Sequence, residues 1–332
     1  MAQPLNVAVL GTGTAADVLL APALGNVEEL RLWGVVSRSM DRALGFAEKH
    51  GTRGRALRVF DDFAQCLAEP DLHAIIVATP DALHAKQIIM AAQAGKHVFC
   101  EKPLATSSDD AQAIVGACNL HGVRLGVGYH HRWHAGHRMV QNQLRDGVIG
   151  DLRHMRVQWT FKARNNENWR AKREMSRWWS LAGVGTHALD MIRWWMMPSC
   201  GEVVQARAMI SRSTYGGPND ETACILLRFE SGATAELLSS VLFESPRRID
   251  LFGTSGAVHC EGTLGPYGEG FISVLGADMH WEVVNPYEGE LRDFALAILE
   301  GRDPEVSGEE ALRNVEILEH ASEFDLKRPA TP

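Results

Sequence analysis

The chain has 332 residues, of which 45% are hydrophobic and 22% are charged, and its formal net charge is −8 at pH 7. This length suits two domains better than one core, and the acidic balance argues against nucleic acid or an anionic membrane as a partner. No apolar run approaches the roughly 20 residues that a membrane span needs, so we expect no membrane partner.

The sequence also indicates a cytoplasmic protein with reduced thiols. The chain passes from Met1 almost directly into an apolar strand pattern, without a basic and then apolar leader. No CxxC pair occurs, and we expect buried, reduced thiols rather than disulfides. The cysteines stand at positions 66, 100, 118, 200, 224 and 260.

Short apolar strand patterns alternate with helical patterns over the first 129 residues. This alternation predicts an α/β domain with a doubly wound parallel sheet, which we place at residues 1–125. The expected strands are 5–10, 31–37, 56–60, 73–79, 97–100 and 123–129, and the clearest helices are 40–51 and 80–95.

The remaining residues, 126–332, read as an α+β domain. They predict a large, mostly antiparallel, open-faced sheet with helices. The strand signals lie at 150–163 and in hairpins at 221–242 and 247–262, and the helices at 185–197, 288–300 and 308–324. We expect the C-terminal helix to pack back on the first domain. A broad half-apolar sheet face is typical of an interface, so we also expect a homodimer or homotetramer formed through this sheet.

The first strand ends in GTGTAA, a GxGxxA motif that opens a helix. Its first glycine permits a tight turn, its second lets the backbone approach a pyrophosphate, and its small last residue lets helix and strand pack closely. At the head of an alternating domain, this motif predicts a dinucleotide-binding Rossmann fold with phosphate on the helix N-terminus. The motif contributes Gly11, Thr12, Gly13, Thr14, Ala15 and Ala16 to the expected cofactor site.

The end of the second strand bears on the choice of dinucleotide. NAD sites place an acidic residue here for the ribose 2′-OH, whereas this chain has Ser37, Arg38 and, one helical turn later, Arg42. A hydroxyl and cations suit a 2′-phosphate, so we expect NADP(H) to be preferred. The arginines could equally be solvated charges, in which case NAD(H) would also bind.

The fourth and fifth strands end in polar residues at the edge where open parallel sheets bind ligands. Thr79 and Pro80 follow the fourth strand, and His84 lies in the next helix, where it could equally be a buried or capping residue. Glu101 and Lys102 follow the fifth strand. We expect Lys102 to face the nicotinamide end of a bound dinucleotide.

Three segments resemble the Gfo/Idh/MocA oxidoreductases: GTGTAA, VATPDALHAKQIIMAAQAGKHVFCEKPLA and THALDMIRWW. Ser37 with Arg42, YHHRW at 129–133 and WR at 169–170 are similar to the NADP-dependent 1,5-anhydro-D-fructose reductase-like branch. The resemblance implies that Lys102 is the acid/base lysine at the reacting sugar hydroxyl. It also implies that Glu101 and a Lys102–Pro103 bond, cis if the family pattern holds, keep that lysine in place.

The family's second motif, Asp-x-x-x-His followed three residues later by Asp, is only partly present. His187 and Asp190 match, but Gly183 stands where the family has aspartate. Lys102 and His187 could divide the proton transfer between them. Otherwise another side chain compensates, hydride transfer is lost, or His187 only orients the domain interface. Asp190 could bond His187 or have a structural role.

The resemblance also implies further contacts near nicotinamide or substrate. The expected substrate-binding residues are His131, Trp169, Arg170 and Asp190, and the additional cofactor-binding residues are Tyr129, Arg132, Trp169, Arg170 and Tyr287. A local excess of arginine and lysine over 153–177 would fit an anionic substrate, although solvated charges are the commoner case.

The stretch HHRWHAGH at 130–137 invites a metal interpretation. His130, His134 and His137 would share one face of a continuous helix, and zinc accepts such ligands. Hydride transfer from a nicotinamide needs no metal, however, and no cysteine or acid completes the set. We therefore expect no metal.

Together these signals predict an NADP(H)-dependent dehydrogenase or reductase that acts on a carbinol or carbonyl carbon of a cyclic sugar or polyol. Lys102 and His187 would be its catalytic residues. Two alternatives stay open at this point. One is a redox-neutral glycosidase with a tightly held, recycled dinucleotide, and the other is a sugar sensor that binds dinucleotide without chemistry.

Overall fold

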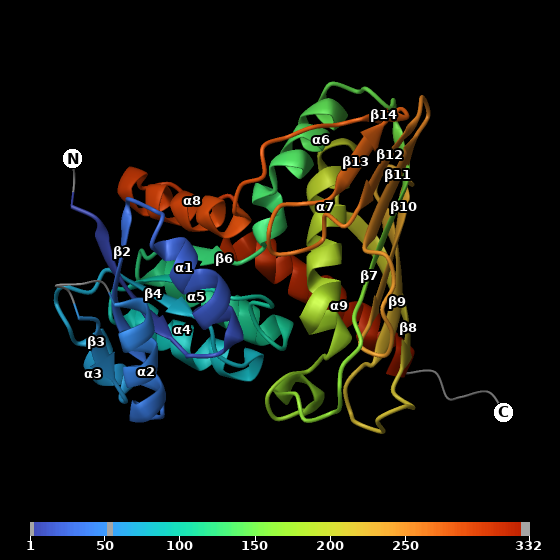
Figure 1. The fold of residues 1–332 in the computed structure, drawn as a ribbon. Helices are drawn as coiled ribbons and strands as arrows, with labels where there is room; N and C mark the ends of the chain where they lie inside the picture. Colours follow the sequence, from blue (N-terminus) through green and yellow to red (C-terminus); the bar gives the residue numbers. More distant parts are fainter. Residues whose placement is uncertain (1–2, 52–55, 327–332) are drawn as a thin grey trace. The chain divides into compact units, whose positions relative to one another are not determined.

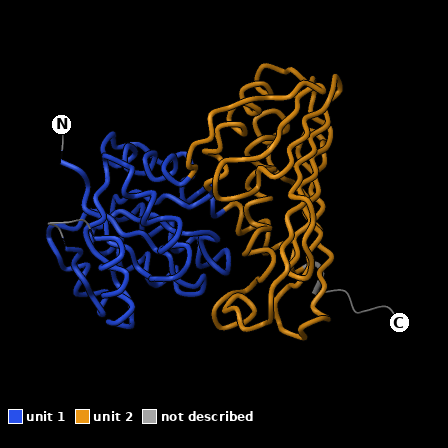
Figure 2. Tube along the Cα trace, viewed as in Figure 1, with its two compact units in different colours: residues 1–129, 287–312 blue, residues 130–286, 313–332 orange. Residues whose placement is uncertain are grey.

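The structure is a computed structural model that describes residues 3–51 and 56–326. The chain divides into two compact units (Figure 2). Unit 1 comprises Met1–Tyr129 and Tyr287–Leu312, and unit 2 comprises His130–Pro286 and Arg313–Pro332. The segment 287–312, which we expected in the second domain, thus lies in unit 1.

Unit 1 is built on a parallel sheet with the strand order β3-β2-β1-β4-β5-β6 within the described residues. This order is that of a doubly wound Rossmann fold, and it brings the carboxyl ends of all its strands to one edge. The strands are β1 (Leu5–Leu10), β2 (Leu30–Val36), β3 (Arg58–Phe60), β4 (Ala74–Val77), β5 (His97–Cys100) and β6 (Leu125–Val127).

Three helices of unit 1, at 40–50, 84–93 and 286–300, fall close to the expected ranges, and no ranges were predicted for the others (Figure 1). The helices of this unit are α1 (Ala21–Leu24), α2 (Met40–His50), α3 (Phe63–Leu67), α4 (His84–Gln93), α5 (Ser108–Leu120) and α8 (Pro286–Glu300), the last lying in unit 1 from Tyr287 onward. A π-helical segment, Ala15–Leu20, precedes α1, and a 3-10 turn, Asp81–Leu83, precedes α4.

The return of α8 to unit 1 has a clear hydrophobic cause. Its Leu291 and Phe294 are buried in the same core as Val7, Val9 and Leu24. Phe294 also meets Phe99 of β5 edge-on, with ring centroids 5.6 Å apart. Burying these side chains removes a broad apolar stripe of α8 from water, and this burial accounts for its place on the first sheet.

Unit 2 contains the second sheet, whose order in the described residues is β14-β13-β12-β11-β7-β10-β9-β8. Its neighbouring strands are antiparallel except for β7 and β10, which are parallel. The strands are β7 (Leu152–Thr160), β8 (Val203–Ser211), β9 (Thr222–Phe229), β10 (Thr234–Ser240), β11 (Arg248–Gly253), β12 (Ala257–Glu261), β13 (Phe271–Val274) and β14 (Ala277–Asp278). Both sheets confirm the predicted fold class.

Helices lie on one face of this second sheet (Figure 1). They are α6 (Ala135–Arg145), α7 (Thr186–Cys200) and α9 (Gly308–Leu326), which belongs to unit 2 from Arg313 onward. Short 3-10 turns occur at His130–Trp133 and Trp169–Ala171, and a π-helical segment, Leu181–Gly185, leads into α7. Alternate residues of β8 and β9 point away from these helices, and Met209 and Leu226 among them are 78% and 59% exposed.

All six cysteines are unpaired, as expected. Cys224 is exposed, however, so the expected burial is wrong for this residue, because its side chain faces outward from β9.

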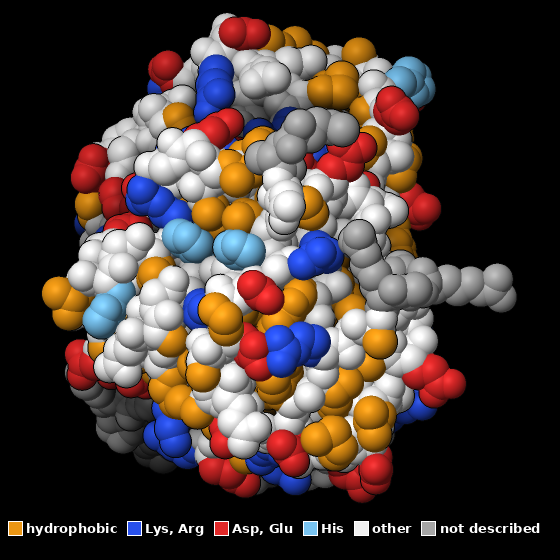
Figure 3. All heavy atoms as spheres, turned by 90° about the vertical axis from the view of Figure 1, so that its left-hand side faces the viewer, with side chains coloured by type: hydrophobic (Ala, Val, Ile, Leu, Met, Phe, Trp, Pro, Cys, Tyr) orange, Lys and Arg blue, Asp and Glu red, His pale blue; other side chains and the backbone are white. Residues whose placement is uncertain are grey.

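On the face shown in Figure 3, acidic and basic side chains are interspersed with hydrophobic ones. No helix of the described residues is long and apolar enough to cross a membrane.

Candidate active site

The turn after β1 has the backbone that the glycine motif requires. Gly11 has φ = 106°, and a Cβ added there would lie 2.6 Å from the carbonyl oxygen of Ala78. At Gly13 an added Cβ would meet no atom within 4 Å, so the backbone is open on that side. Thr14 caps the following helical segment without a side-chain hydrogen bond. The Thr14 side chain therefore leaves the first amides of this helix uncapped, and such amides suit a phosphate group.

The end of β2 presents hydroxyls and cations next to this turn. The Ser37 Oγ lies 3.5 Å from the Thr12 Oγ1 and accepts a hydrogen bond from the Ser39 backbone. Arg38 and Arg42 are exposed. The side chains expected near the adenosine ribose are thus accessible from solvent, within the same unit as the glycine turn.

The tips of β4 and β5 are held together by a buried histidine. The two ring nitrogens of His84 each lie 3.0 Å from a carbonyl oxygen, one of Thr79 and the other of Pro103. The Thr79 hydroxyl donates to Gln87 at 2.5 Å. These contacts tie the ends of the two strands to the start of α4, and they give His84 a positioning role beside the Glu101–Lys102–Pro103 turn.

Lys102 itself is buried, with 8% of its surface exposed, and the Lys102–Pro103 peptide bond is cis. Lysines are rarely buried without an interaction, and Lys102 makes at least one polar or electrostatic interaction in the structure. Its low exposure separates it from the ordinary solvated lysines of the surface.

A buried acid near this turn was not identified from the sequence. Glu290 of α8 is 1% exposed, and neither of its carboxylate oxygens has a hydrogen-bond partner among the described residues. Burial, and then the charge of Glu101, raise the pKa of Glu290 well above its usual range. The sequence signal was weak, because a glutamate in an amphipathic helix is most often exposed. Tyr287, expected at the cofactor, lies in the unit 1 core, and Tyr129 is fully buried.

Unit 2 gathers a cluster of imidazoles that the sequence did not predict as a group. We call His130, His131 and His187 the histidine cluster. The His130 ring lies 4.1 Å from the ring of His131 and 4.9 Å from that of His187, and the His131 and His187 rings are 5.0 Å apart. All three side chains are buried, and Trp159 of β7 meets both His131 and His187.

The expected helical face of His130, His134 and His137 is not formed. Residues 130–133 make a 3-10 turn, and His134 is the N-cap of α6, accepting a hydrogen bond from the His137 backbone. The rings of His134 and His137 stack on each other at 4.1 Å. His130 instead belongs to the histidine cluster, because the change from 3-10 turn to α-helix at His134 breaks the helical register that the sequence spacing assumed.

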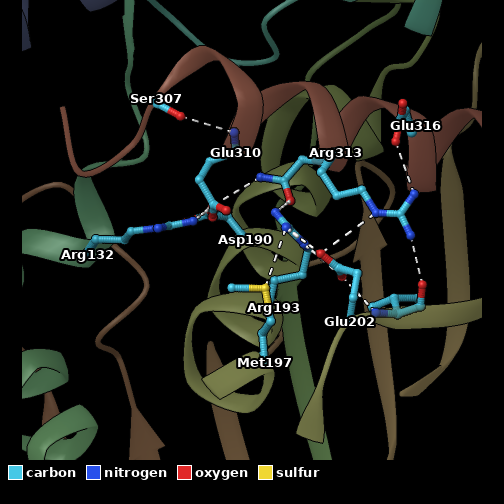
Figure 4. A network of polar contacts seen from close by, with 11 residues as sticks. Arg132, Asp190, Arg193, Met197, Glu202, Ser307, Glu310, Arg313 and Glu316 are labelled. Carbon is cyan, nitrogen blue, oxygen red and sulfur yellow. Dashed lines mark hydrogen bonds and ion pairs between the residues drawn. The ribbon is translucent and has the colours of Figure 1, made fainter. Parts of the chain in front are cut away.

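Asp190 and Arg132 form a buried ion pair. Arg132 follows His131 in the sequence, and Asp190 lies on the same helix, α7, as His187. The Arg132 Nε and Nη2 donate to the two carboxylate oxygens of Asp190 at 2.9 and 2.6 Å (Figure 4). The Asn314 Nδ2 donates to the same carboxylate at 3.0 Å. Both ionic side chains are almost completely buried. The polar atoms of Asp190 are thus engaged by Arg132 and Asn314, which gives both residues a role in fixing α7 against the 130–133 turn.

Trp169 and Arg170 occupy a short 3-10 turn. The Arg170 guanidinium lies over the Trp169 ring, 4.2 Å from its centroid, and the Asn219 side chain donates to the Arg170 carbonyl at 2.6 Å. Part of the basic excess over 153–177 is paired with acidic side chains. Ion pairs link Arg153 with Asp151, Arg156 with Glu236, and Arg177 with Glu319.

Gly183 lies in the π-helical segment that leads into α7. A Cβ added there would meet only the Phe161 ring, at 3.5 Å and 3.8 Å, which is ordinary van der Waals contact. Packing therefore leaves room for a Cβ at this position, so contacts with neighbouring atoms do not require the glycine that stands where the family motif has aspartate. A second π-helical segment follows the glycine turn in unit 1. Such segments are frequent at functional sites, and here each one adjoins a motif expected to carry chemistry.

Comparisons with known proteins agree with this arrangement of motifs. Residues 5–129 match the model of an oxidoreductase family with an NAD-binding Rossmann fold, and residues 137–259 match the GFO/IDH/MocA C-terminal domain. The chain is 30% identical to a 4-carboxy-2-hydroxymuconate-6-semialdehyde dehydrogenase of Sphingobium sp., over 91% of this chain and 93% of the relative.

Two further relatives are named for sugar chemistry. One is a 1,5-anhydro-D-fructose reductase of Ensifer adhaerens, which is 27% identical over 84% of each chain. The other is the crystal structure of an aldose-aldose oxidoreductase from Caulobacter crescentus complexed with glycerol. It superposes with a TM-score of 0.90 at 26% identity and covers 98% of both chains. The chain belongs to the Gfo/Idh/MocA family of NAD(P)-binding oxidoreductases.

Proposed function

We propose that this protein transfers hydride between NADP(H) and a carbinol or carbonyl carbon of a cyclic sugar or polyol. The observation that carries the proposal is the buried Lys102 at the end of β5, in the same unit as the open glycine turn. The sugar class is supported by the relatives named for 1,5-anhydro-D-fructose and aldose chemistry.

The residues of this chain would divide the work as follows. When bound, the nicotinamide supplies or accepts the hydride. Lys102 moves the hydroxyl proton, and Glu101 and His84 keep the lysine turn in place. His187 binds the same or the neighbouring oxygen and shares the proton.

The remaining side chains would bind and orient the two ligands. His131, Trp169 and Arg170 hold the substrate, and Asp190 acts through Arg132 to keep the 130–133 turn in position. The glycine turn binds the pyrophosphate with the amides that follow Thr14.

The direct test is transfer of an isotope label. Purified protein would be incubated with NADPH that carries deuterium at the nicotinamide C4 and with a panel of keto-sugars, and the products would be analysed by mass spectrometry. We expect deuterium on one carbinol carbon of at least one sugar, with equivalent oxidation of the dinucleotide. Tight dinucleotide binding without label transfer to any sugar in either direction would contradict the proposal.

The preference for NADP(H) over NAD(H) has its own test. Arg38→Ala with Arg42→Ala should weaken NADPH binding by about tenfold, because each removed cation faces a 2′-phosphate at an exposed site. NADH affinity should stay within about twofold, since NADH lacks that phosphate. Arg145→Ala, which removes an exposed arginine of α6 in unit 2, is the matched control. Equal losses for both dinucleotides in the double variant would contradict the preference.

We also propose that the outer face of the second sheet joins copies of this chain into a homodimer or homotetramer. Exposed apolar side chains of β8 and β9, including Val204, Met209 and Leu226, gather on this face. Light scattering after size exclusion should give a multiple of the 36.5 kDa chain mass. Met209→Glu combined with Leu226→Glu should shift the protein toward the monomer, and a wild-type monomer would contradict the proposal.

A further inference from the structure

The histidine cluster offers three nitrogen ligands at one point in unit 2. His130 and His131 come from the 3-10 turn before α6, and His187 comes from the first turn of α7. One ligand atom from each of these residues lies within 4.8 Å of the other two. The three side chains are 3%, 1% and 4% exposed, so they meet in a site shielded from bulk water.

His131 carries a second, independent observation. Both of its ring nitrogens are buried without a hydrogen-bond partner among the described residues. Buried polar atoms are nearly always satisfied, and an unsatisfied one indicates a missing group such as an ion.

We propose that His130, His131 and His187 bind one divalent transition-metal ion of the zinc class. Three imidazoles with a fourth position open to water or substrate make up a ligand set typical of catalytic zinc. Nitrogens around a tetrahedral zinc lie roughly 3.4 Å apart, because each Zn–N bond is about 2.1 Å long. Small rotations of the imidazoles would therefore close the present separations of up to 4.8 Å.

The other two histidines nearby are engaged elsewhere. The His134 ring bonds the Glu269 carbonyl at 3.1 Å, and the His137 Nδ1 bonds the His131 carbonyl at the same distance. The second bond holds the main chain at His131, which makes His137 a support for the ligand set. The Asp190 carboxylate is engaged by Arg132 and Asn314. The ion would keep its full charge and attract an anionic oxygen to its open position.

A metal here would also account for the missing aspartate. In the metal-bound protein the charge of the ion would stabilise a developing alkoxide on the substrate, so the substrate oxygen would bind the ion instead of His131 and His187, and a proton-accepting carboxylate at position 183 would not be needed. This catalytic consequence rests on the proposed function, whereas metal binding itself does not. The two can therefore fail separately in an experiment.

The test is titration of chelator-treated, full-length protein with Co²⁺, followed by visible absorption and by metal analysis after Zn²⁺ loading. Wild type should bind one ion per chain and give the intense bands of four-coordinate cobalt. His131→Gln and His187→Asn should each weaken binding by about 100-fold. His134→Asn is the matched control, because it removes a neighbouring imidazole and retains an oxygen that can cap α6. It should bind like wild type.

Folding of each variant would be checked by circular dichroism and by thermal melting with and without Zn²⁺. Zn²⁺ should raise the melting temperature of wild type and of His134→Asn but not that of His131→Gln. Metal binding no tighter in wild type than in a folded His131→Gln would overturn the inference. Equal loss in the His134→Asn control would also overturn it. Isotope transfer by a metal-free wild type would leave the proposed function standing and remove the catalytic role of the ion.

Discussion

Unit 1 and unit 2 place their chemical side chains in different ways. In unit 1 they follow contiguous motifs at strand ends, as at Gly11 after β1 and Lys102 after β5. In unit 2 the histidine cluster joins two segments that lie far apart in the sequence, the 3-10 turn at 130–133 and the start of α7. A parallel sheet brings all its strand ends to one edge, whereas an antiparallel sheet with helices has no such rule.

The two units also hold their chemical side chains in place by different interactions. The unit 1 motifs depend on backbone conformation, with Gly11 at a φ that other residues rarely adopt. The unit 2 cluster depends on a buried ion pair between Arg132 and Asp190 that joins its two segments. Each unit should therefore be disrupted by a different kind of substitution, unit 1 by a change at a glycine and unit 2 by the loss of one partner of the ion pair.

The largest expected effect on stability is in unit 2. Asp190→Ala leaves the Arg132 guanidinium buried without its carboxylate, which should cost about 3–5 kcal/mol of unfolding free energy. Replacing both residues, as Arg132→Met with Asp190→Leu, should recover most of that loss because no buried charge remains. Urea denaturation would measure both effects. Dinucleotide binding by unit 1 should persist in the double variant, and a cost below about 1 kcal/mol for Asp190→Ala would contradict the scaffold role.

A matched pair of glycine substitutions tests unit 1. Gly11→Ala should destabilise unit 1 by about 3 kcal/mol, because it combines an unfavourable φ with a Cβ placed against the Ala78 carbonyl. Gly13→Ala meets no atom, so it should change stability by less than about 0.5 kcal/mol and yet weaken dinucleotide binding. Thermal melting and fluorescence titration with NADPH separate the two effects. Equal effects of the two substitutions on stability would refute this division of roles.

Substitution of Glu290 should change the unfolding free energy by a smaller amount, and this change should depend on pH. The Glu290 carboxyl stays protonated in the folded chain, while the unfolded chain releases that proton near its ordinary pKa of 4.5. The unfolding free energy of the wild type should therefore fall as the pH rises above 4.5, by at most about 1.4 kcal/mol per pH unit from this group. Glu290→Gln does not titrate, so it should be the more stable protein at pH 6 and equal to wild type at pH 4.

Denaturation at several pH values would follow this divergence between Glu290→Gln and the wild type. Glu288→Gln, on the same helix, is a suitable control, because burial does not isolate that residue in the same way. A constant difference between Glu290→Gln and wild type across this range would contradict the account of a buried neutral acid.

Sequence patterns were sufficient for most of unit 1. The alternation of strands and helices, the glycine turn and the polar strand ends each depend on residues close together in the chain, and the structure has them where local rules place them. Glu290 escaped notice because its burial depends on how α8 packs on the first sheet. The place of α8 is set by tertiary contacts such as that of Phe294 with Phe99.

The arrangement within unit 2 was harder to predict for the same reason. Spacing alone grouped His130 with His134 and His137, whereas the helix actually begins after His134. The partner that completes the histidine cluster, His187, comes from α7 and was identified only through the family motif. The Arg132–Asp190 pair likewise joins residues that no local pattern connects.

In the proposed function, Lys102 handles the proton that accompanies hydride exchange. The most direct measurement is single-turnover oxidation of bound NADPH by a responsive sugar in wild type, in Lys102→Met and in the surface control Lys86→Met. We predict that Lys102→Met binds NADPH within about threefold of wild type but reacts about 10²–10⁴-fold more slowly, because its side chain keeps its length and loses the ammonium group. The control should match wild type, and a rate for Lys102→Met close to that of wild type would contradict the account.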